Sequence, residues 1–344
     1  MKSKIWLNEV SFMRPILLIL LVTYHAFAPY CGAWIMPDGI NEVELYDWVA
    51  LLTRAFRLEG FVFVSGYIFT FQILAKHKFD TAISLFRNKF QRLIIPGIIF
   101  GALYYYLFRE VVHPYWKIGY EIVSGVGHLW YLPCLFWCFM VQYWLLSKQQ
   151  SRRLVVLLLF ILCFLSFLPL PLQLGRVFYY MLFFYGGGIF YEYSYMFRNY
   201  ATGKIIVMAW GLFTLLFFLL NIFMDANRGL LRDSNSFILK VFLLGVNNLS
   251  KALLGWSGII ALYLSSILYC AKHHIGSIII LIGSCGYGVY VIHQFVLVYL
   301  YRYTSFPQIT GTMLMPWVAL VITIVVSLLL TMGIRKTSFG RKYL

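Results

Sequence analysis

Two side chains suited to proton transfer and anion binding lie on one apolar stretch near the N-terminus. In FMRPILLILLVTYHAF, Arg14 and His25 are eleven positions apart, and the residues between them are nearly all apolar. On an α-helix with ~3.6 residues per turn and ~1.5 Å rise per residue, the two side chains share a face roughly 16 Å apart. A guanidinium can bind phosphate oxygens, and an imidazole can accept a proton near neutral pH. The spacing therefore predicts an anion site at one end of the helix and a general base at the other.

Both residues are costly in a helix that crosses a membrane. An ionisable side chain in lipid is unfavourable unless it faces a cavity or a partner, so it marks a functional site by default. The structural alternatives are a snorkelling anchor for Arg14 and a hydrogen-bonded core histidine for His25. The shared face favours the functional interpretation of both residues.

A second basic cluster occurs in RNKFQRLIIPG, where an apolar stretch begins at residue 93. Lys89 and Arg92 are three positions apart, which would place them on one face of an α-helix. Together with Arg14 they could bind the phosphates of a ligand that arrives from the cytoplasm. The alternative is a loop whose charges only set the orientation of the chain in the membrane.

Three further candidates fall near the predicted outer face of the membrane. Glu59 could pair with Arg57, or the two could orient an imidazole, and in GHLWYL the side chains of His128 and Trp130 could form a platform for a sugar ring. The alternative for His128 and Trp130 is an interfacial aromatic belt. Ser65-Gly66 falls in the middle of the same span as Glu59 and predicts close packing between helices.

The late segment CGYGVYVIHQF holds the last candidates. Tyr290 and His293 fall on overlapping faces of a helix, at a depth similar to that of His25. They could support the acceptor or the base, and the alternative is a packed, hydrogen-bonded helix end.

The elements that must position these residues are transmembrane helices. The chain has 344 residues, of which 62% are hydrophobic and only 12% charged, whereas soluble domains average about a quarter charged. The net charge of +16 comes mostly from short loops beside apolar stretches, which indicates contact with the lipid bilayer and excludes nucleic acid as a partner. The six cysteines lie mostly in apolar stretches without metal-ligand spacing, so we expect no metal site and no bound cofactor.

The fold class predicted from these patterns is an all-α polytopic membrane protein with about ten transmembrane helices in one bundle. More of the basic residues, including Lys2 and Lys4, fall in cytoplasmic segments if both termini are cytoplasmic, as the positive-inside rule requires. Residues 235–248 form an additional apolar stretch that is too short to span and could lie in the interface or re-enter. The predicted spans are 12–30, 57–75, 93–109, 128–147, 154–169, 176–191, 204–224, 250–271, 278–302 and 313–333.

This topology accommodates an acyl donor that carries phosphates. The donor would bind Arg14 and Arg92 from the cytoplasm, and a thin arm of about 15 Å would reach His25 along the helix. Extended pantetheine has about that length, and a histidine can take the proton of a hydroxyl that attacks a thioester. No GxSxG nucleophile elbow is present, so direct transfer with His25 as general base is simpler than a serine acyl-enzyme.

At these residues the chain resembles the acyltransferase 3 family of multi-pass membrane O-acyltransferases. The family's Arg, ten residues, His motif matches Arg14 and His25, and its FFxxSGY-like second span matches GFVFVSGY. Its RxxR motif corresponds to Lys89-Phe-Gln-Arg92, with lysine in place of the first arginine. Its Trp-Phe-Leu-like span resembles LWYL, and its Tyr-Gly-x-Tyr-x-x-His motif matches Tyr287 to His293.

The resemblance implies transfer of an acyl group, usually acetyl from acetyl-CoA as co-substrate, to a hydroxyl of a surface or lipid-linked glycan. His25 would be the catalytic base, and Arg14, Arg92 and Lys89 would bind the donor, although lysine cannot bind phosphate in a bidentate manner. We expect one acyltransferase-3-like domain over residues 1–344, no fused extracytoplasmic domain, and a location in the bacterial inner membrane.

Two other classes of protein remain open from the sequence. One is a transporter or flippase for an anionic or acyl-linked solute, because buried arginine and histidine also line transport pathways. The other is a structural partner of a polysaccharide synthase.

Overall fold

The computed structural model describes residues 7–108, 114–148 and 150–344, and every regular element within these ranges is a helix. The predicted cytoplasmic residues Lys2 and Lys4, and residue 109 at the end of the third predicted span, lie outside the described residues. The first seven helices are α1 (Asn8–Ala26), α2 (Glu44–Arg54), α3 (Arg57–Leu74), α4 (Ala82–Lys89), α5 (Ile95–Phe108), α6 (Tyr115–Ser124) and α7 (Tyr131–Ser147), with the short segments η2 (Phe90–Ile94) and η3 (Gly127–Trp130) between them. The remaining helices are α8 (Arg152–Phe164), α9 (Leu174–Glu192), α10 (Ser194–Tyr200), α11 (Gly203–Asp233), α12 (Phe237–Lys272), α13 (Ser277–Arg302), α14 (Phe306–Lys336) and α15 (Ser338–Tyr343), with the short segment η4 (Pro171–Gln173) before α9.

Seven helical segments of the described chain are long and apolar enough to cross a membrane, the pattern expected of a multi-pass membrane protein. Helices α3, α8 and α9 lie in the three other predicted spans but fall outside this set, and α8 ends at Phe164, before the predicted end of its span at residue 169. Helix α8 has 13 residues, which extend ~20 Å against a hydrocarbon core of ~30 Å. The seven segments are Asn8–Ala26, Ala82–Phe108, Gly127–Ser147, Gly203–Asp233, Phe237–Lys272, Ser277–Arg302 and Phe306–Lys336. A total of ten spans, with both termini cytoplasmic, stays a prediction.

The chain forms two compact units that alternate along the sequence. Unit 1 consists of Met1–Met13, Glu59–Phe90 and Leu132–His274, and unit 2 consists of Arg14–Leu58, Gln91–Tyr131 and Ile275–Leu344.

Glycines allow two helices of unit 1 to approach closely. A Cβ atom at Gly66 of α3 would lie 1.9 Å from the carbonyl oxygen of Phe184 in α9, and one at Gly187 would lie 2.1 Å from the carbonyl oxygen of Phe63. Neither contact is possible with a larger residue, so the two backbones pack directly against each other. This confirms the close packing predicted from Ser65-Gly66.

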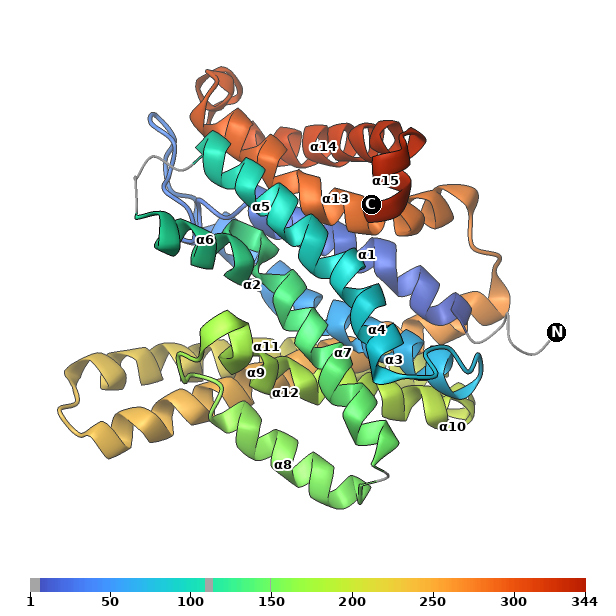
Figure 1. Ribbon diagram of the computed structural model, residues 1–344. Coiled ribbons are helices and arrows are strands. Elements are labelled where there is room, and N and C mark those ends of the chain that lie inside the picture. The colour runs from blue at the N-terminus through green and yellow to red at the C-terminus, as the bar shows by residue number, and fades with distance from the viewer. Residues whose placement is uncertain (1–6, 109–113, 149) are drawn as a thin grey trace. The chain divides into compact units, whose positions relative to one another are not determined.

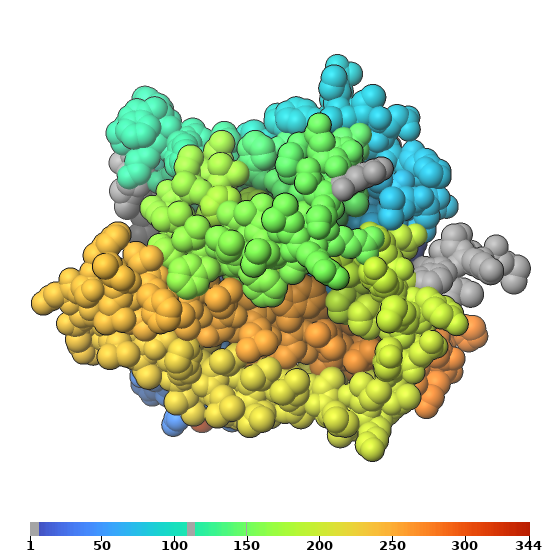
Figure 2. All heavy atoms as spheres, turned by 90° about the horizontal axis from the view of Figure 1, so that it is seen from below, coloured from blue at the N-terminus to red at the C-terminus, as the bar shows by residue number. Residues whose placement is uncertain are grey.

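Helices α11 and α12 of unit 1 form a long antiparallel pair (Figure 1). Each helix begins with a side-chain cap: the hydroxyl of Thr202 accepts from the amide of Ile205, and that of Ser236 accepts from Leu239. Residues 237–248 are the first turns of α12, so the apolar stretch 235–248 is not a separate interfacial segment. Large apolar side chains of α11 are exposed on the face seen in Figure 2, as expected for a surface that meets lipid.

Unit 2 contains α1 after residue 13 and the paired helices α13 and α14 (Figure 1). The segment that follows α1 is held by a buried apolar cluster with members from α13 and α14. The Tyr301 hydroxyl donates to the carbonyl oxygen of Ala26 at 2.6 Å, and the Tyr30 hydroxyl donates to that of Thr312 at 2.6 Å. These contacts fix the end of α1, where His25 lies. The cluster comprises Ala26, Phe27, Tyr30, Ile40, Tyr46, Ala50, Leu297, Tyr301, Met315 and Ala319.

Candidate functional site

His25 and His293 meet inside unit 2. His25 Nδ1 lies 3.2 Å from His293 Nε2, and the two ring centroids are 4.8 Å apart. His25 is 8% exposed and His293 is fully buried. Two of the residues predicted from separate motifs therefore form one pair.

The pair arises because α1 and α13 run in the same direction. Leu18 lies beside Gly286, where a Cβ atom would be 3.9 Å from Leu18 Cδ2. His25 and His293 each follow these contact points by seven residues in their own helices. A Cβ atom at position 286 would meet Leu18 at an ordinary van der Waals distance, so this contact marks where the two helices lie side by side, and two helical turns later the same faces bring the histidines together.

The hydrogen bonds of the pair determine which nitrogen of each ring carries a proton. His293 Nδ1 faces the carbonyl oxygens of Tyr290 at 2.6 Å and Val289 at 3.3 Å, and carbonyls only accept, so this nitrogen is protonated. In neutral His293, Nε2 is then an acceptor. His25 Nδ1 faces that acceptor and the carbonyl of Leu21 at 2.9 Å, so it carries the proton of the neutral ring. The remaining nitrogen, His25 Nε2, is left with its lone pair, and no other described residue bonds to it.

His128 is brought to the same cluster by a tight glycine turn. Gly125 has φ +92°, and a Cβ atom there would lie 2.4 Å from Trp130 Cα, so only glycine permits this turn. The His128 ring lies 4.8 Å from that of His293, with its nitrogens 3.1 Å from Gln294 Oε1 and 3.0 Å from the Val291 carbonyl oxygen. Both nitrogens are engaged with α13, so His128 fastens the turn to this helix.

Tyr290 and Trp130 complete this attachment. The Tyr290 hydroxyl donates to the carbonyl oxygen of His128 at 2.5 Å. Trp130 is half-buried and packs edge-on against Tyr131, with ring centroids 6.2 Å apart. Tyr290 thus holds the backbone of the turn. Trp130, predicted as a platform for a sugar, lies at the end of η3 and packs on the start of α7.

Two aromatic side chains that sequence reasoning missed lie beside His25. The Trp34 ring lies 6.0 Å from the His25 ring, and the Tyr24 ring lies 5.0 Å from it. The guanidinium carbon of Arg57 sits 3.7 Å from the centroid of the Tyr24 ring, a cation–π contact. Tyr24 could have been identified from the sequence, because it directly precedes His25. Trp34 lies in an irregular segment, and no local pattern points to its position.

Arg14 and Arg92 lie toward the other end of α1. Arg14 is partly buried, and no described residue forms an ion pair or side-chain hydrogen bond with its guanidinium. The Tyr287 hydroxyl donates to the backbone carbonyl of Arg92 at 2.9 Å, which ties Arg92 to α13 one residue after the Gly286 contact with Leu18. Arg92 is therefore held near the level of Leu18 along α1. Because Leu18 follows Arg14 by four residues, this level is ~6 Å along the helix axis from Arg14. The Arg92 side chain itself is exposed.

The predicted α-helical relation between Lys89 and Arg92 is wrong. Helix α4 ends at Lys89, and residues Phe90–Ile94 form a π-helix, whose wider turn removes the expected common face. Lys89 belongs to unit 1, where its ammonium lies 3.5 Å from the centroid of the Phe139 ring. Arg92 belongs to unit 2.

Glu59 also belongs to unit 1. Its side chain is buried and accepts a hydrogen bond from the Tyr179 hydroxyl at 3.0 Å. Glu59 is thus held within the helix packing of unit 1, and its predicted role in orienting an imidazole stays a prediction.

The cluster is not arranged as a metal centre. Among the described residues no group of three His, Cys, Asp or Glu side chains could hold a metal ion. Of the ring nitrogens of His25, His128 and His293, only His25 Nε2 is not engaged with a described residue. The arrangement offers one base rather than a set of ligands.

The comparisons with known proteins bear on what such a base would do. No curated protein and no solved structure matches the chain. The model of the acyltransferase domain family, acyltransferase 3, matches residues 7–336, which include every candidate site residue named above. The resemblance seen in the motifs is confirmed, and the chain belongs to the acyltransferase 3 family of membrane acyltransferases.

Proposed function

We propose that this protein is an O-acyltransferase of the bacterial inner membrane that transfers an acyl group, most simply acetyl, from cytoplasmic acyl-CoA to a hydroxyl of a surface or lipid-linked glycan. The observation that carries the proposal is the hydrogen-bonding of the His25–His293 pair, which leaves His25 Nε2 with its lone pair. A neutral imidazole with a fixed tautomer is the group that general-base catalysis of acyl transfer requires.

The reaction follows from that geometry. His25 Nε2 takes the proton of the acceptor hydroxyl as its oxygen attacks the thioester carbon. The tetrahedral intermediate then expels the thiolate, which takes the proton back from the imidazolium, so the products are the ester and the free thiol. Arg57, on the Tyr24 ring beside His25, is a suitable group to stabilise the oxyanion of the intermediate.

The donor would bind at the other end of α1. Arg14 offers guanidinium N–H groups that no described residue uses, and Arg92 adds a second cation near that level. Phosphate groups on these arginines would leave the thioester arm roughly 16 Å to reach His25. Lys89 remains a candidate donor contact through charge alone.

Removing the Arg14 side chain is expected to weaken donor binding specifically. A charged hydrogen bond to phosphate contributes enough that Arg14→Ala should raise the KM for acetyl-CoA roughly tenfold to a hundredfold with little change in the acceptor KM. The assay uses the purified chain in proteoliposomes with labelled acetyl-CoA and an acceptor glycan, and Arg54→Ala, an exposed arginine of unit 2, is the control. Solute flux across these liposomes without acyl-CoA, together with no labelled glycan, would instead establish a transporter.

Trp34 is the best candidate to contact the acceptor sugar. It is half-buried beside His25, and the flat face of an aromatic ring packs against the C–H face of a sugar. We expect Trp34→Ala to raise the acceptor KM roughly three- to tenfold, and Trp34→Phe to retain most of the affinity. Trp116→Ala, which alters an exposed tryptophan of unit 2, should have no effect. An unchanged acceptor KM in Trp34→Ala would exclude this contact.

A further inference from the structure

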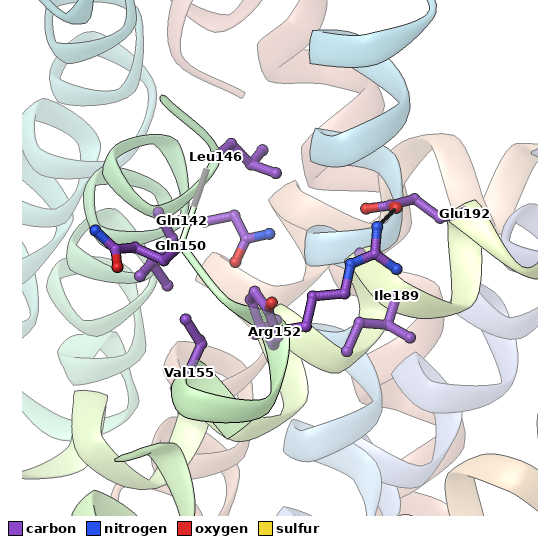
Figure 3. Close-up of a pocket in the computed structure, with 10 residues that line it drawn as sticks. Gln142, Leu146, Gln150, Arg152, Val155, Ile189 and Glu192 are labelled. Atoms are coloured by element: carbon purple, nitrogen blue, oxygen red, sulfur yellow. Dashed lines mark hydrogen bonds and ion pairs between the residues drawn. The ribbon is translucent and has the colours of Figure 1, made fainter. Parts of the chain in front are cut away.

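Unit 1 contains a cavity that the reaction described above does not use. Its volume is about 290 Å³, and it lies between the end of α7, the start of α8 and the end of α9 (Figure 3). The volume corresponds to about ten water molecules and is near the lower end of the range for small-molecule sites. By the loop charges these helix ends are on the cytoplasmic side of the membrane.

One buried side chain in this cavity has no hydrogen-bond partner. Gln142 is 1% exposed, and its Oε1 makes no hydrogen bond with any described residue. A buried amide oxygen without a partner is costly. In Figure 3 Gln142 extends from α7 toward Arg152 and Glu192, whereas Gln150 extends away from them. The Gln142 amide therefore faces the cavity, and its oxygen could accept a hydrogen bond from a ligand there.

The position of this amide is built into the helix packing. Gly188 of α9 lines the same cavity, and a Cβ atom there would lie 3.0 Å from Gln142 Nε2 and 2.6 Å from Thr70 Oγ1. Glycine at position 188 leaves room for the amide group. The hydroxyl of Thr70 is buried and, among the described residues, also lacks a partner.

The rest of the lining consists of apolar walls and one ion pair. Leu145, Val155 and Ile189 line the cavity together with Tyr185. Arg152 and Glu192 form an ion pair (Figure 3), and Arg152 Nη1 donates to the Tyr193 hydroxyl at 2.8 Å. These two contacts use part of the five N–H donors of Arg152. The cavity thus combines apolar walls, an amide that offers a donor beside an acceptor, and a partly exposed cation.

We propose that this cavity binds the adenine ring of an adenosine phosphate. A glutamine amide pairs with the edge of adenine through two hydrogen bonds: its oxygen accepts from the N6 amino group, and its NH₂ donates to a ring nitrogen. The flat apolar faces of the base fit the apolar walls, and a guanidinium such as that of Arg152 suits a phosphate or the face of the base. A sugar would place hydroxyls against Leu145, Val155 and Ile189 and leave them unsatisfied.

The adenine has two possible sources, and only one of them rests on the proposed function. It is either the adenosine end of the acyl-CoA donor or a separate adenine nucleotide. If it is the donor, Gln142→Leu raises the KM for acetyl-CoA about tenfold and leaves that for acetyl-phosphopantetheine, which lacks adenosine, unchanged. If it is a separate nucleotide, ADP binds without competing with acetyl-CoA. Either result supports an adenine site.

The deciding experiment is ADP binding to the purified full chain in detergent, measured by calorimetry. Loss of the paired amide should weaken ADP binding about tenfold or more in Gln142→Leu. Gln142→Glu, which keeps the shape but removes the NH₂ donor, should also weaken it, while Gln72→Leu, at a half-buried glutamine of α3, should not. This measurement needs no acyl transfer, so it distinguishes failure of the adenine site from failure of the proposed function.

Four results would overturn the adenine site, and the first three concern ADP. They are no ADP binding by the wild-type chain, equal binding of ADP by wild type and both Gln142 variants, and equal affinity for ADP and ribose 5-phosphate. Binding of GDP as tight as that of ADP would also refute recognition of adenine.

Discussion

His25→Ala should lower the rate of acyl transfer by about 10²- to 10⁴-fold, the range that general acid–base catalysis contributes. His25 Nε2 is the nitrogen left with its lone pair in a cluster whose other ring nitrogens are engaged with described residues. Its loss removes the group that takes the acceptor proton, while the apolar residues that surround it keep the helix in place. The measurement is kcat for labelled acyl transfer by purified protein in liposomes.

The control for this variant is His274→Ala, at an exposed histidine of unit 1. It should transfer acyl groups at the wild-type rate. In wild type the rate should rise with pH as the imidazole base loses its proton, and His25→Ala should lose that dependence. An active His25→Ala protein with an unaltered pH profile would show that another group is the base.

His293→Phe should reduce kcat about 10- to 100-fold, less than the loss of His25 itself. His293 Nε2 accepts the proton of His25 Nδ1 and so keeps the other nitrogen of His25 available. Residues that fix the tautomer of a catalytic histidine contribute up to about 10⁴-fold. Here the carbonyl of Leu21 still accepts from His25 Nδ1 at 2.9 Å, which retains part of the orientation. The measurement is kcat and both KM values under the conditions used for His25→Ala.

A glutamine at position 293 distinguishes a positioning role from a packing role. The amide oxygen of glutamine can accept from His25 Nδ1, as His293 Nε2 does, whereas phenylalanine fills the space without an acceptor. We therefore expect His293→Gln to recover much of the activity that His293→Phe loses, with the pH profile of wild type. If both variants lose the same activity, His293 only fills space in the core.

The sequence was informative about helices and about which residues share one helix. Each of the ten proposed spans contains a described helix, although α1 and α8 end before their predicted spans do, and Arg14 and His25 lie on one helix as predicted. Contacts between distant segments could not be predicted, because depth in the membrane does not determine which helices are neighbours. His25 and His293 were matched only in depth, and their contact depends on α1 and α13 lying side by side, as Leu18 and Gly286 do.

Local irregularities limited the prediction of the remaining site residues. Lys89 and Arg92 were related by the α-helical period, which the π-helix at Phe90–Ile94 breaks. Trp34 lies beside His25 because an apolar cluster fixes the irregular segment after α1, and such segments have no periodicity to use. Gln142 lies in an apolar helix, and its possible role in binding can be recognised only from the cavity that it lines.

The most direct test of acyl transfer by His25 is mass spectrometry of surface glycans from cells that produce the wild-type chain, the His25→Ala chain or neither. If His25 is the base, only the wild-type chain adds the mass of an acyl group, most simply one acetyl, to the glycan, with both proteins present in the membrane at equal levels. Glycans of identical mass from cells producing the wild-type and His25→Ala chains would contradict acyl transfer by His25.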